Sequence, residues 1–529
     1  MSIEIGNFTI RRKLNYKWML FIIIILYFLY ISTLLLNSSP KFISPDETIN
    51  YYFSTIYSST GNLYYSDELN KIASGIIHPR GSIYIDNNNN IVPGKFIGFP
   101  FIVGNLMVNL PLIWKYITGI LSLLGVLLIY IIIKDISSKK NALLSSGILI
   151  IMPAYFYWST MYLYENIMGC FFILLSLKYF NDVVLGKKKT PSEFLAGFFL
   201  GMALFVRPDY VIFILPPFLF ICILYRRHIR VKGIIIAFIA LMLPLIPLFY
   251  FNNLLYGNFI KTGFHTTYSL TLLQSTGQLV NISNVGFLMP LFDDFHCIIN
   301  NFYELLKLNT VFVIFIFFGL LYSIKNFKKE NNHFQIFYIS SLTLYALFIL
   351  KRSAISLLLL HNSYVRYALP LYALSVFFIS LFIIKYDNRS IKPLIVLILI
   401  VTSITTAFPE LEQNIKTTNE YFTMSEKIVK ITEPNAVIFT HYWDKVFFPE
   451  RRVGIVKEIP GNKLNRSKDL CEIIIRIHET GTPVYIHNSR QFNQVADYAF
   501  LKRELQLNGY ILMHKEMDLY KIETNQSIK

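Results

Sequence analysis

The sequence predicts a polytopic α-helical membrane protein, with about 11 transmembrane helices followed by a small C-terminal α/β domain. Two bulk properties point to this fold class: 54% of the 529 residues are hydrophobic, and only 15% are charged. A third observation is positional, because apolar windows recur until about residue 408 and then give way to shorter, mixed segments. A soluble enzyme would not sustain such windows over most of its length.

The apolar windows are separated by charged or turn-rich breaks, and each is interpreted as a membrane span. They lie at roughly 18–36, 112–133, 141–158, 165–183, 192–206, 210–225, 233–251, 309–325, 334–350, 364–385 and 391–408. The first window carries no charge and lacks a small-residue cleavage site, so we expect a retained anchor. The window at 192–206 is short, and the segment 96–110 is apolar enough to be embedded or re-entrant.

The distribution of basic residues sets the predicted orientation. The stretches expected on the same side as the N-terminus hold 20 Lys and Arg residues, whereas the short turns at 159–164 and 207–209 hold one. Because basic loops stay in the cytoplasm, we expect a multi-pass protein of the cell membrane with a cytoplasmic N-terminus and an extracytoplasmic C-terminus. The same distribution accounts for the net charge of +17 without a nucleic-acid partner.

Three long segments are expected on the outer face. Two are loops, at 37–111 and 252–308, and the third is the tail, at 409–529. Residues 1–408 thus form the predicted membrane domain. In the tail, short β-rich runs alternate with amphipathic helical stretches, which is typical of an α/β domain. The β-rich runs lie at 436–440, 483–487 and 510–522, and the helical stretches lie near 467–480 and 491–507.

An acidic pair, Asp46 and Glu47, lies ten residues beyond the first window, in the first outer loop. One interpretation is structural, since an Asp at a helix start accepts free backbone N–H groups. The other is catalytic: one carboxylate acts as a general base at the membrane surface, and its neighbour orients the acceptor or holds a cation. Both interpretations can hold together, because a helix start also fixes a catalytic side chain.

Two further ionisable groups lie at the outer ends of spans. Glu165, at the mouth of the fourth window, is either functional or an interfacial residue within a belt of tyrosine and tryptophan. Arg207, in the turn before the sixth window, is either neutralised by Asp209 or faces an anion such as phosphate.

Other cationic groups are expected on the same face. His361 and Arg366 precede the tenth window, where Arg366 either extends to lipid headgroups or clamps a lipid phosphate. Arg80 and Lys95 add positive charge to the loop that holds Asp46. Carboxylates and cations thus converge at the depth where a lipid phosphate would lie.

Several common site motifs are missing from the sequence. There is no CxxC or His/Cys cluster, so no metal ligands are predicted, although a divalent cation stays open. There is no Walker loop, GxSxG elbow or HExxH helix either, which leaves nucleotide chemistry and standard hydrolase sites without support.

Several segments, in this order, resemble the GT-C glycosyltransferases, polytopic enzymes that use polyprenyl-phosphate sugars. The likeness covers about residues 10–410 and is closest to the dolichyl-phosphate-mannose protein mannosyltransferase and aminoarabinose-transferase-like branch. The matching segments are FISPDETINYYF (42–53), GNLYY (61–65), PGKFIGFPFIVG (93–104), YWSTMYLYEN (157–166), GMALFVRPDY (201–210), NNLLYGNFIKTGF (252–264) and VRYALP (365–370).

This resemblance implies a GT-C-like fold and transfer of a hexose, with mannose expected, from a polyprenyl- or dolichyl-phosphate carrier. The acceptor would be a glycan, lipid or protein on the outer membrane face, as in protein glycosylation or cell-envelope assembly. In the family the acidic residue of the first outer loop is the proposed base, which here is Asp46, with Glu47 beside it. Family arginines and lysines hold the lipid phosphate, which points to Arg207 and Arg366. One base and a phosphate leaving group suffice for an inverting displacement.

Two other functions remain open from the sequence. A lipid-linked-sugar flippase, or another transporter, would place ionisable groups near the bilayer midplane, often in two repeated halves. The sequence shows no repeat, and its candidate charges lie at span ends. A non-catalytic scaffold whose tail binds a partner is the third hypothesis.

Overall fold

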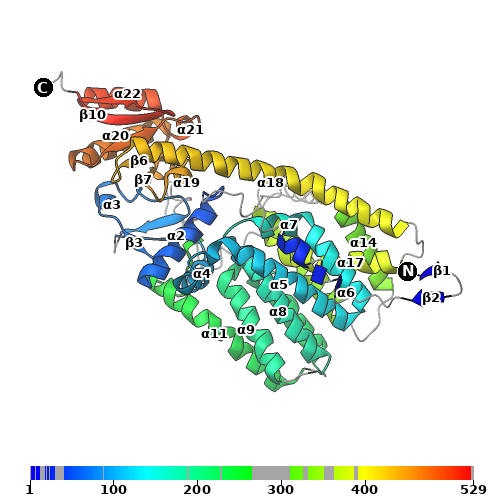
Figure 1. Cartoon of the computed structure of the whole chain (residues 1–529). Coiled ribbons are helices and arrows are strands. Elements are labelled where there is room, and N and C mark those ends of the chain that lie inside the picture. The colour runs from blue at the N-terminus through cyan, green and yellow to red at the C-terminus, as the bar shows by residue number, and fades with distance from the viewer. Residues whose placement is uncertain are drawn as a thin grey trace.

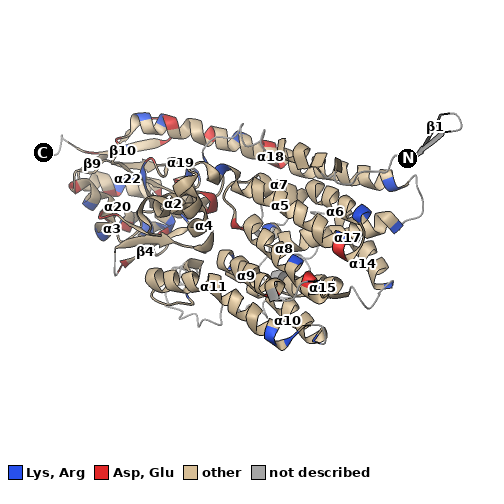
Figure 2. Cartoon of the chain, turned by 60° about the horizontal axis from the view of Figure 1, so that its bottom comes forward, with Lys and Arg blue, Asp and Glu red and all other residues tan. Residues whose placement is uncertain are grey.

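The computed structural model consists of a helical bundle and a C-terminal sheet domain, which one long helix connects (Figure 1). It describes residues 2–5, 8–11, 18–19, 21–22, 24–29, 41–86, 89–187, 190–226, 229–264, 310–325, 332–350, 363–385 and 391–525. A short hairpin of β1 (Ser2–Ile5) and β2 (Phe8–Arg11) lies at the N-terminal end. Charged residues gather in the sheet domain and the adjoining half of the long helix, whereas the bundle helices are largely uncharged (Figure 2).

The bundle helices follow the apolar windows of the sequence. They are α5 (Ile113–Ile136), α6 (Lys139–Ile151), α7 (Pro153–Thr160), α8 (Glu165–Val184), α9 (Thr190–Val206), α10 (Leu215–Leu224), α11 (Val231–Tyr256), α14 (Thr310–Lys325), α15 (Asn332–Leu350), α16 (Ser363–Tyr367), α17 (Leu369–Lys385) and α18 (Ile391–Ile431). A 3-10 turn, η2 (Pro208–Val211), joins α9 to α10. Apolar side chains of these helices form one continuous core.

Four of the described helices, α5, α8, α11 and α18, are long and apolar enough to cross a membrane, which agrees with a multi-pass protein. A fifth span results if α6 and α7 are counted together, although they are bent by 61°. The bend lies at Pro153, which lacks the N–H that would continue the helix, so the predicted span 141–158 is broken. Other apolar helices have 10–17 residues, so the count of about 11 spans stays a prediction.

The described part of the first predicted outer loop folds into three helices and a small sheet. Helix α2 (Pro45–Thr60) packs against α4 (Gly98–Asn109), the segment that was predicted to be embedded or re-entrant. Between them lie α3 (Leu69–Ile72) and an antiparallel sheet in the order β3-β5-β4. Its strands are β3 (Tyr65–Ser66), β4 (Ser82–Ile85) and β5 (Asn90–Pro93).

The C-terminal domain is a five-stranded sheet in the order β7-β6-β8-β10-β9. The first three strands in this order are parallel, and β10 pairs antiparallel with both of its neighbours. The strands are β6 (Val437–Thr440), β7 (Arg452–Ile455), β8 (Val484–His487), β9 (Tyr510–His514) and β10 (Leu519–Thr524). The helices are α19 (Asp444–Phe447), α20 (Lys463–Glu479), α21 (Phe492–Val495) and α22 (Tyr498–Leu507).

The boundary predicted between residues 408 and 409 falls inside α18, which runs through Pro409 without a break. The division into two domains therefore remains a prediction. The C-terminal domain is also joined to the first loop, because Ala73, Ile76 and Ile77 belong to the apolar core under the sheet. A backbone hydrogen bond of 2.9 Å from Ile455 N to Ile76 O extends this contact along β7.

Candidate active site

The first turn of α2 holds the acidic pair, and its geometry answers the question of capping. Ser44 is the N-cap, and its hydroxyl accepts the backbone N–H of Asp46 at 3.1 Å. The carboxylate of Glu47 accepts the backbone N–H of Ser44 at 3.1 Å, which completes a capping box. Glu47 thus caps the helix, whereas the carboxylate of Asp46 is directed to other groups.

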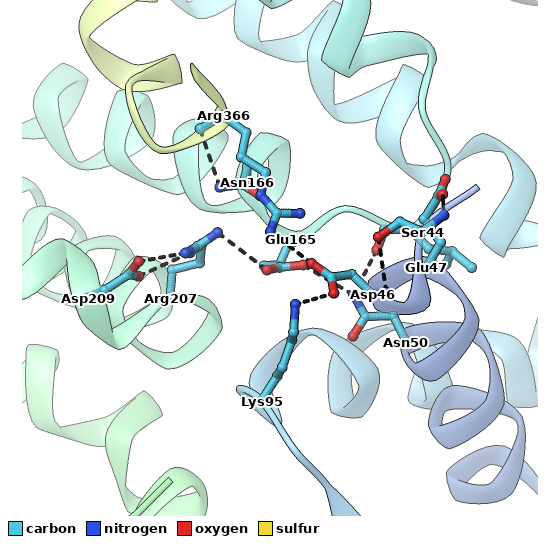
Figure 3. Close-up of polar contacts among 11 residues, drawn as sticks. Ser44, Asp46, Glu47, Asn50, Lys95, Glu165, Asn166, Arg207, Asp209 and Arg366 are labelled. Atoms are coloured by element: carbon cyan, nitrogen blue, oxygen red, sulfur yellow. Dashed lines mark hydrogen bonds and ion pairs between the residues drawn. The ribbon is translucent and has the colours of Figure 1, made fainter. Parts of the chain in front are cut away.

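Asp46 lies between two cations that come from distant parts of the chain (Figure 3). Lys95, which follows β5, pairs with one carboxylate oxygen, and Arg366 of α16 donates to the other at 2.8 Å. Burial by itself would raise the pKa of Asp46, but the attraction of Lys95 and Arg366 outweighs it and holds the pKa below its ordinary value. Asp46 is therefore ionised at neutral pH.

A second cluster of ion pairs lies beside the first. Arg207 donates to both carboxylate oxygens of Asp209, at 3.0 and 2.5 Å, and to Glu165 at 3.3 Å (Figure 3). The side chain of Arg207 is only 2% exposed. The pair with Asp209, one of the two alternatives for Arg207, is therefore present. The other described polar partner of the Arg207 side chain, Glu165, is also a carboxylate.

Asn50 links α2, the helix that carries Asp46, to the second cluster. Its side-chain amide donates to Glu165 at 3.1 Å and to the backbone oxygen of Leu163 at 2.8 Å. Asn50 lies four residues after Asp46 on α2, so both side chains project from the same face of the helix. Sequence reasoning missed Asn50, although this spacing from Asp46 is a signal that could have found it.

Aromatic rings surround the two arginines. The Arg207 guanidinium lies 4.4 Å from the ring centre of Tyr367, and the Arg366 guanidinium lies 5.1 Å from that of Tyr164 and 5.7 Å from that of Trp158. These cation–π contacts exclude water from one side of each guanidinium, which strengthens its interaction with anions.

The charges of the two clusters balance. Asp46, Glu165 and Asp209 face Lys95, Arg207 and Arg366, so each carboxylate already has a cationic partner. Among the described residues, no three His, Cys, Asp or Glu side chains come together as metal ligands. A divalent cation would have to compete with a lysine and two arginines, so this donor set does not fit a metal ion.

Glu47 faces a different space from Asp46. It lines a small cavity of about 40 Å³ together with Lys41, Tyr162 and residues of α18. That cavity shares Leu411 and Ile415 with an open groove of about 1020 Å³ along α18. Burial and the nearby charge of Asp46 raise the pKa of Glu47 to about 8, although the hydrogen bond from Ser44 opposes the shift.

One predicted site residue lies apart from these clusters, and another falls outside the described part of the chain. Arg80 pairs with Asp444 of α19 at 2.6 Å and lies over the ring of Tyr442 at 4.4 Å, at the contact with the C-terminal domain. His361 lies outside the residues that the structure describes. The structure brings together the other predicted residues Asp46, Glu47, Lys95, Glu165, Arg207 and Arg366 around the first turn of α2.

Comparison with known proteins gives a family match over part of the chain and a shared fold. Residues 113–251 match the family model described as dolichyl-phosphate-mannose-protein mannosyltransferase. No match was found among curated protein sequences.

Two solved structures share the fold at low sequence identity. ArnT from Cupriavidus metallidurans, bound to undecaprenyl phosphate, matches with a TM-score of 0.59 and 8% identity over 96% of this chain and 98% of that chain. An oligosaccharyltransferase from Archaeoglobus fulgidus, in complex with Zn and sulfate, matches with a TM-score of 0.51 and 12% identity over 96% of this chain and 73% of that chain. Residues 113–251 are therefore similar to the dolichyl-phosphate-mannose-protein mannosyltransferases, and the fold of the chain is similar to those of ArnT and the oligosaccharyltransferase, which agrees with the resemblance to GT-C glycosyltransferases in the sequence.

Proposed function

We propose that this protein transfers a hexose, with mannose as the expected sugar, from a polyprenyl- or dolichyl-phosphate carrier to an acceptor on the outer membrane face. The acceptor class remains open among glycans, lipids and proteins. The family match is to mannosyltransferases, and the ArnT structure of similar fold holds undecaprenyl phosphate. The observation that carries the proposal is the position of Asp46 between Lys95 and Arg366.

Lys95 and Arg366 are the proposed ligands of the donor phosphate. They approach one carboxylate from different elements, and a phosphate has the same charge sign and a similar set of acceptor oxygens. Arg207 has a different proposed role, because its guanidinium is directed at Asp209 and Glu165. We assign it to holding Glu165, which in turn fixes Asn50 on α2.

Asp46 is the proposed base. When the donor phosphate shares the charge of Lys95 and Arg366, the attraction that lowers the Asp46 pKa weakens and its carboxylate becomes more basic. An acceptor hydroxyl or amine then attacks the anomeric carbon, and the bond from that carbon to the phosphate oxygen breaks. The polyprenyl phosphate leaves with the electron pair, Asp46 takes the acceptor proton, and the anomeric configuration inverts.

Glu47 is the proposed neighbour of the base on the acceptor side. Its raised pKa and its position in the cavity beside α18 make it the alternative base. No step of this proposal uses a metal ion, because the charge-balanced donor set does not fit one.

A transfer assay with matched variants tests the proposal. Purified protein in liposomes would be incubated with a panel of radiolabelled polyprenyl-phosphate sugars and a membrane extract that supplies acceptors. Wild-type protein should form a labelled product, and Asp46→Asn should lose activity by about 100-fold or more. Asp67→Asn is the control, because Asp67 lies in the same loop but pairs with Arg452 of the C-terminal domain.

Two outcomes would overturn the proposal. Full transfer by Asp46→Asn would remove Asp46 as the base. Movement of the labelled lipid across the bilayer without any new product would favour a flippase instead.

A further inference from the structure

We propose that Lys445, from the C-terminal domain, is a positioning residue that holds the first turn of α2 in the geometry required for sugar transfer. This inference rests on the proposed function and deepens it, because it makes the C-terminal domain part of the catalytic arrangement.

The contact is made at the residue before the helix cap. The ammonium group of Lys445 donates to the backbone oxygen of Ile43, and Ser44 next to it is the N-cap of α2. Lys445 lies in α19 and also packs over the ring of Tyr421 from α18, 4.8 Å from the ring centre. The side chain thus joins the segment that leads into α2 to the C-terminal domain and to α18.

A second contact holds the same segment. The ammonium group of Lys41 donates to the backbone oxygen of Phe448 at 3.2 Å and pairs with Glu450 at 2.5 Å. Phe448 also packs its ring against Tyr52 of α2, with 4.5 Å between ring centres. Residues 41–43 are therefore held at two points by residues 445–450, immediately before the helix that carries Asp46 and Glu47.

The segment around Lys445 is itself fixed to the first loop. Asp444 accepts the side chain of Arg80 at 2.6 Å and its backbone N–H at 3.0 Å. The charges that act on Lys445 are Arg80, Asp444 and Glu47. Burial and Arg80 lower the pKa of Lys445 to about 8, whereas Asp444 and Glu47 oppose the shift. Lys445 is close enough to Glu47 for each to influence the charge of the other.

Loss of this contact should change the rate more than donor binding. Lys95 and Arg366 belong to other elements, so the proposed phosphate ligands stay in place when Lys445 is shortened. The first turn of α2, which carries Asp46 and Glu47, would lose one of the contacts that hold it. Small displacements of a reacting group reduce rates strongly.

Steady-state kinetics of three variants test this role. Lys445→Gln should lower kcat about tenfold while the KM for the donor changes by no more than about twofold. Lys445→Arg should recover most of the rate, because a guanidinium can also donate to the oxygen of Ile43. Arg452→Gln is the control, since it breaks the 2.7 Å pair with Asp67 between the same two parts of the protein, away from the first turn of α2. Equal effects of Lys445→Gln and Arg452→Gln, or an effect on KM alone, would overturn the inference.

A second readout needs no transfer activity and separates this inference from the proposed function. The rate at which an amine-selective reagent labels Lys445 would be followed by mass spectrometry across a pH range around 8, in wild type and in Glu47→Gln. Because the charge of Glu47 raises the pKa of Lys445, Glu47→Gln should shift the labelling curve to lower pH. The exposed Lys71 serves as the internal control. An unshifted Lys445 curve would contradict the inference even if transfer is confirmed, and a shifted curve would support the placement even if transfer is not found.

Discussion

Asp46 and Glu47 are adjacent on α2, yet they face two different regions of the molecule. Asp46 is directed to a charge-balanced cluster in which Lys95 and Arg366 hold it ionised. Glu47 is directed to a small cavity lined in part by α18, and burial raises its pKa to about 8. Successive residues of a helix point about 100° apart, so one turn can present carboxylates of opposite character to two spaces.

This contrast suggests a division between donor and acceptor. The Asp46 side has the cations that a donor phosphate requires, and the cavity beside Glu47 shares lining residues with an open groove of about 1020 Å³ that could hold another molecule. A base located between the two spaces would be close to both reactants.

The largest difference is expected between Asp46→Asn and Glu47→Gln in the transfer assay. Asp46→Asn removes the proposed base and should lower kcat by about 100-fold or more. Glu47→Gln keeps an oxygen for the capping box, so its loss of kcat should be about tenfold or less. A larger loss of kcat for Glu47→Gln than for Asp46→Asn would instead identify Glu47 as the base.

Substitutions of the two buried arginines, Arg366 and Arg207, should have different effects. Arg366→Gln removes a proposed phosphate ligand and should weaken donor binding by about 10- to 100-fold. Arg207→Gln leaves Glu165 and Asp209 buried without their cation, so it should destabilise the fold by about 3–5 kcal/mol. Donor titration and thermal unfolding in detergent would separate the two effects, and a wild-type melting temperature for Arg207→Gln would contradict the assignment.

The dependence of stability on pH should report the raised pKa of Glu47. Glu47 has a pKa of about 8 in the folded protein, against an ordinary value of 4.5, so between these values the unfolded chain releases a proton that the folded chain keeps. Stability should therefore fall as pH rises from about 4.5 to about 8. Glu47→Gln should remove this part of the decline in melting temperature, and parallel curves for the two proteins would contradict the raised pKa.

The smallest effect is expected at the pair of Arg452 with Asp67, which joins the first loop to the C-terminal domain away from Asp46 and Glu47. Arg452 is 41% exposed, so its pair with Asp67 should contribute about 1 kcal/mol or less to stability. Asp67→Asn should leave both donor binding and kcat close to wild type. A large loss of transfer in this variant would show that transfer depends on any contact between the first loop and the C-terminal domain, and not on contacts near the first turn of α2.

The sequence was most informative where local patterns decide the structure. Apolar windows predicted the positions of the bundle helices, and the short apolar runs at 436–440 and 483–487 became β6 and β8. One interpretation of the sequence placed the helix cap at Asp46, whereas in the structure Ser44 is the N-cap and Glu47 completes a capping box. Strand β7 was missed, because its four residues include Gly454 and show no clear alternation.

Long-range pairing could not be read from the sequence. Asp46 and Arg366 are separated by 320 residues, and no local pattern indicates which of the many cations on the predicted outer face reaches the carboxylate. Arg80 and Lys95 looked equivalent in the sequence, yet β4 and β5 separate them and direct Arg80 to Asp444. The contribution of Lys445 was also hidden, because it depends on how the C-terminal domain packs on the first loop.

We propose that the Asp46 carboxylate and the donor phosphate compete for the charge of Lys95 and Arg366. The most direct measurement is the Kd of polyprenyl phosphate for Asp46→Asn compared with wild type, at one fixed pH and salt concentration. Because Asn removes an anion that competes for both cations, the variant should bind the lipid phosphate about tenfold more tightly, although it no longer transfers sugar. Unchanged or weaker binding by Asp46→Asn would contradict the claim.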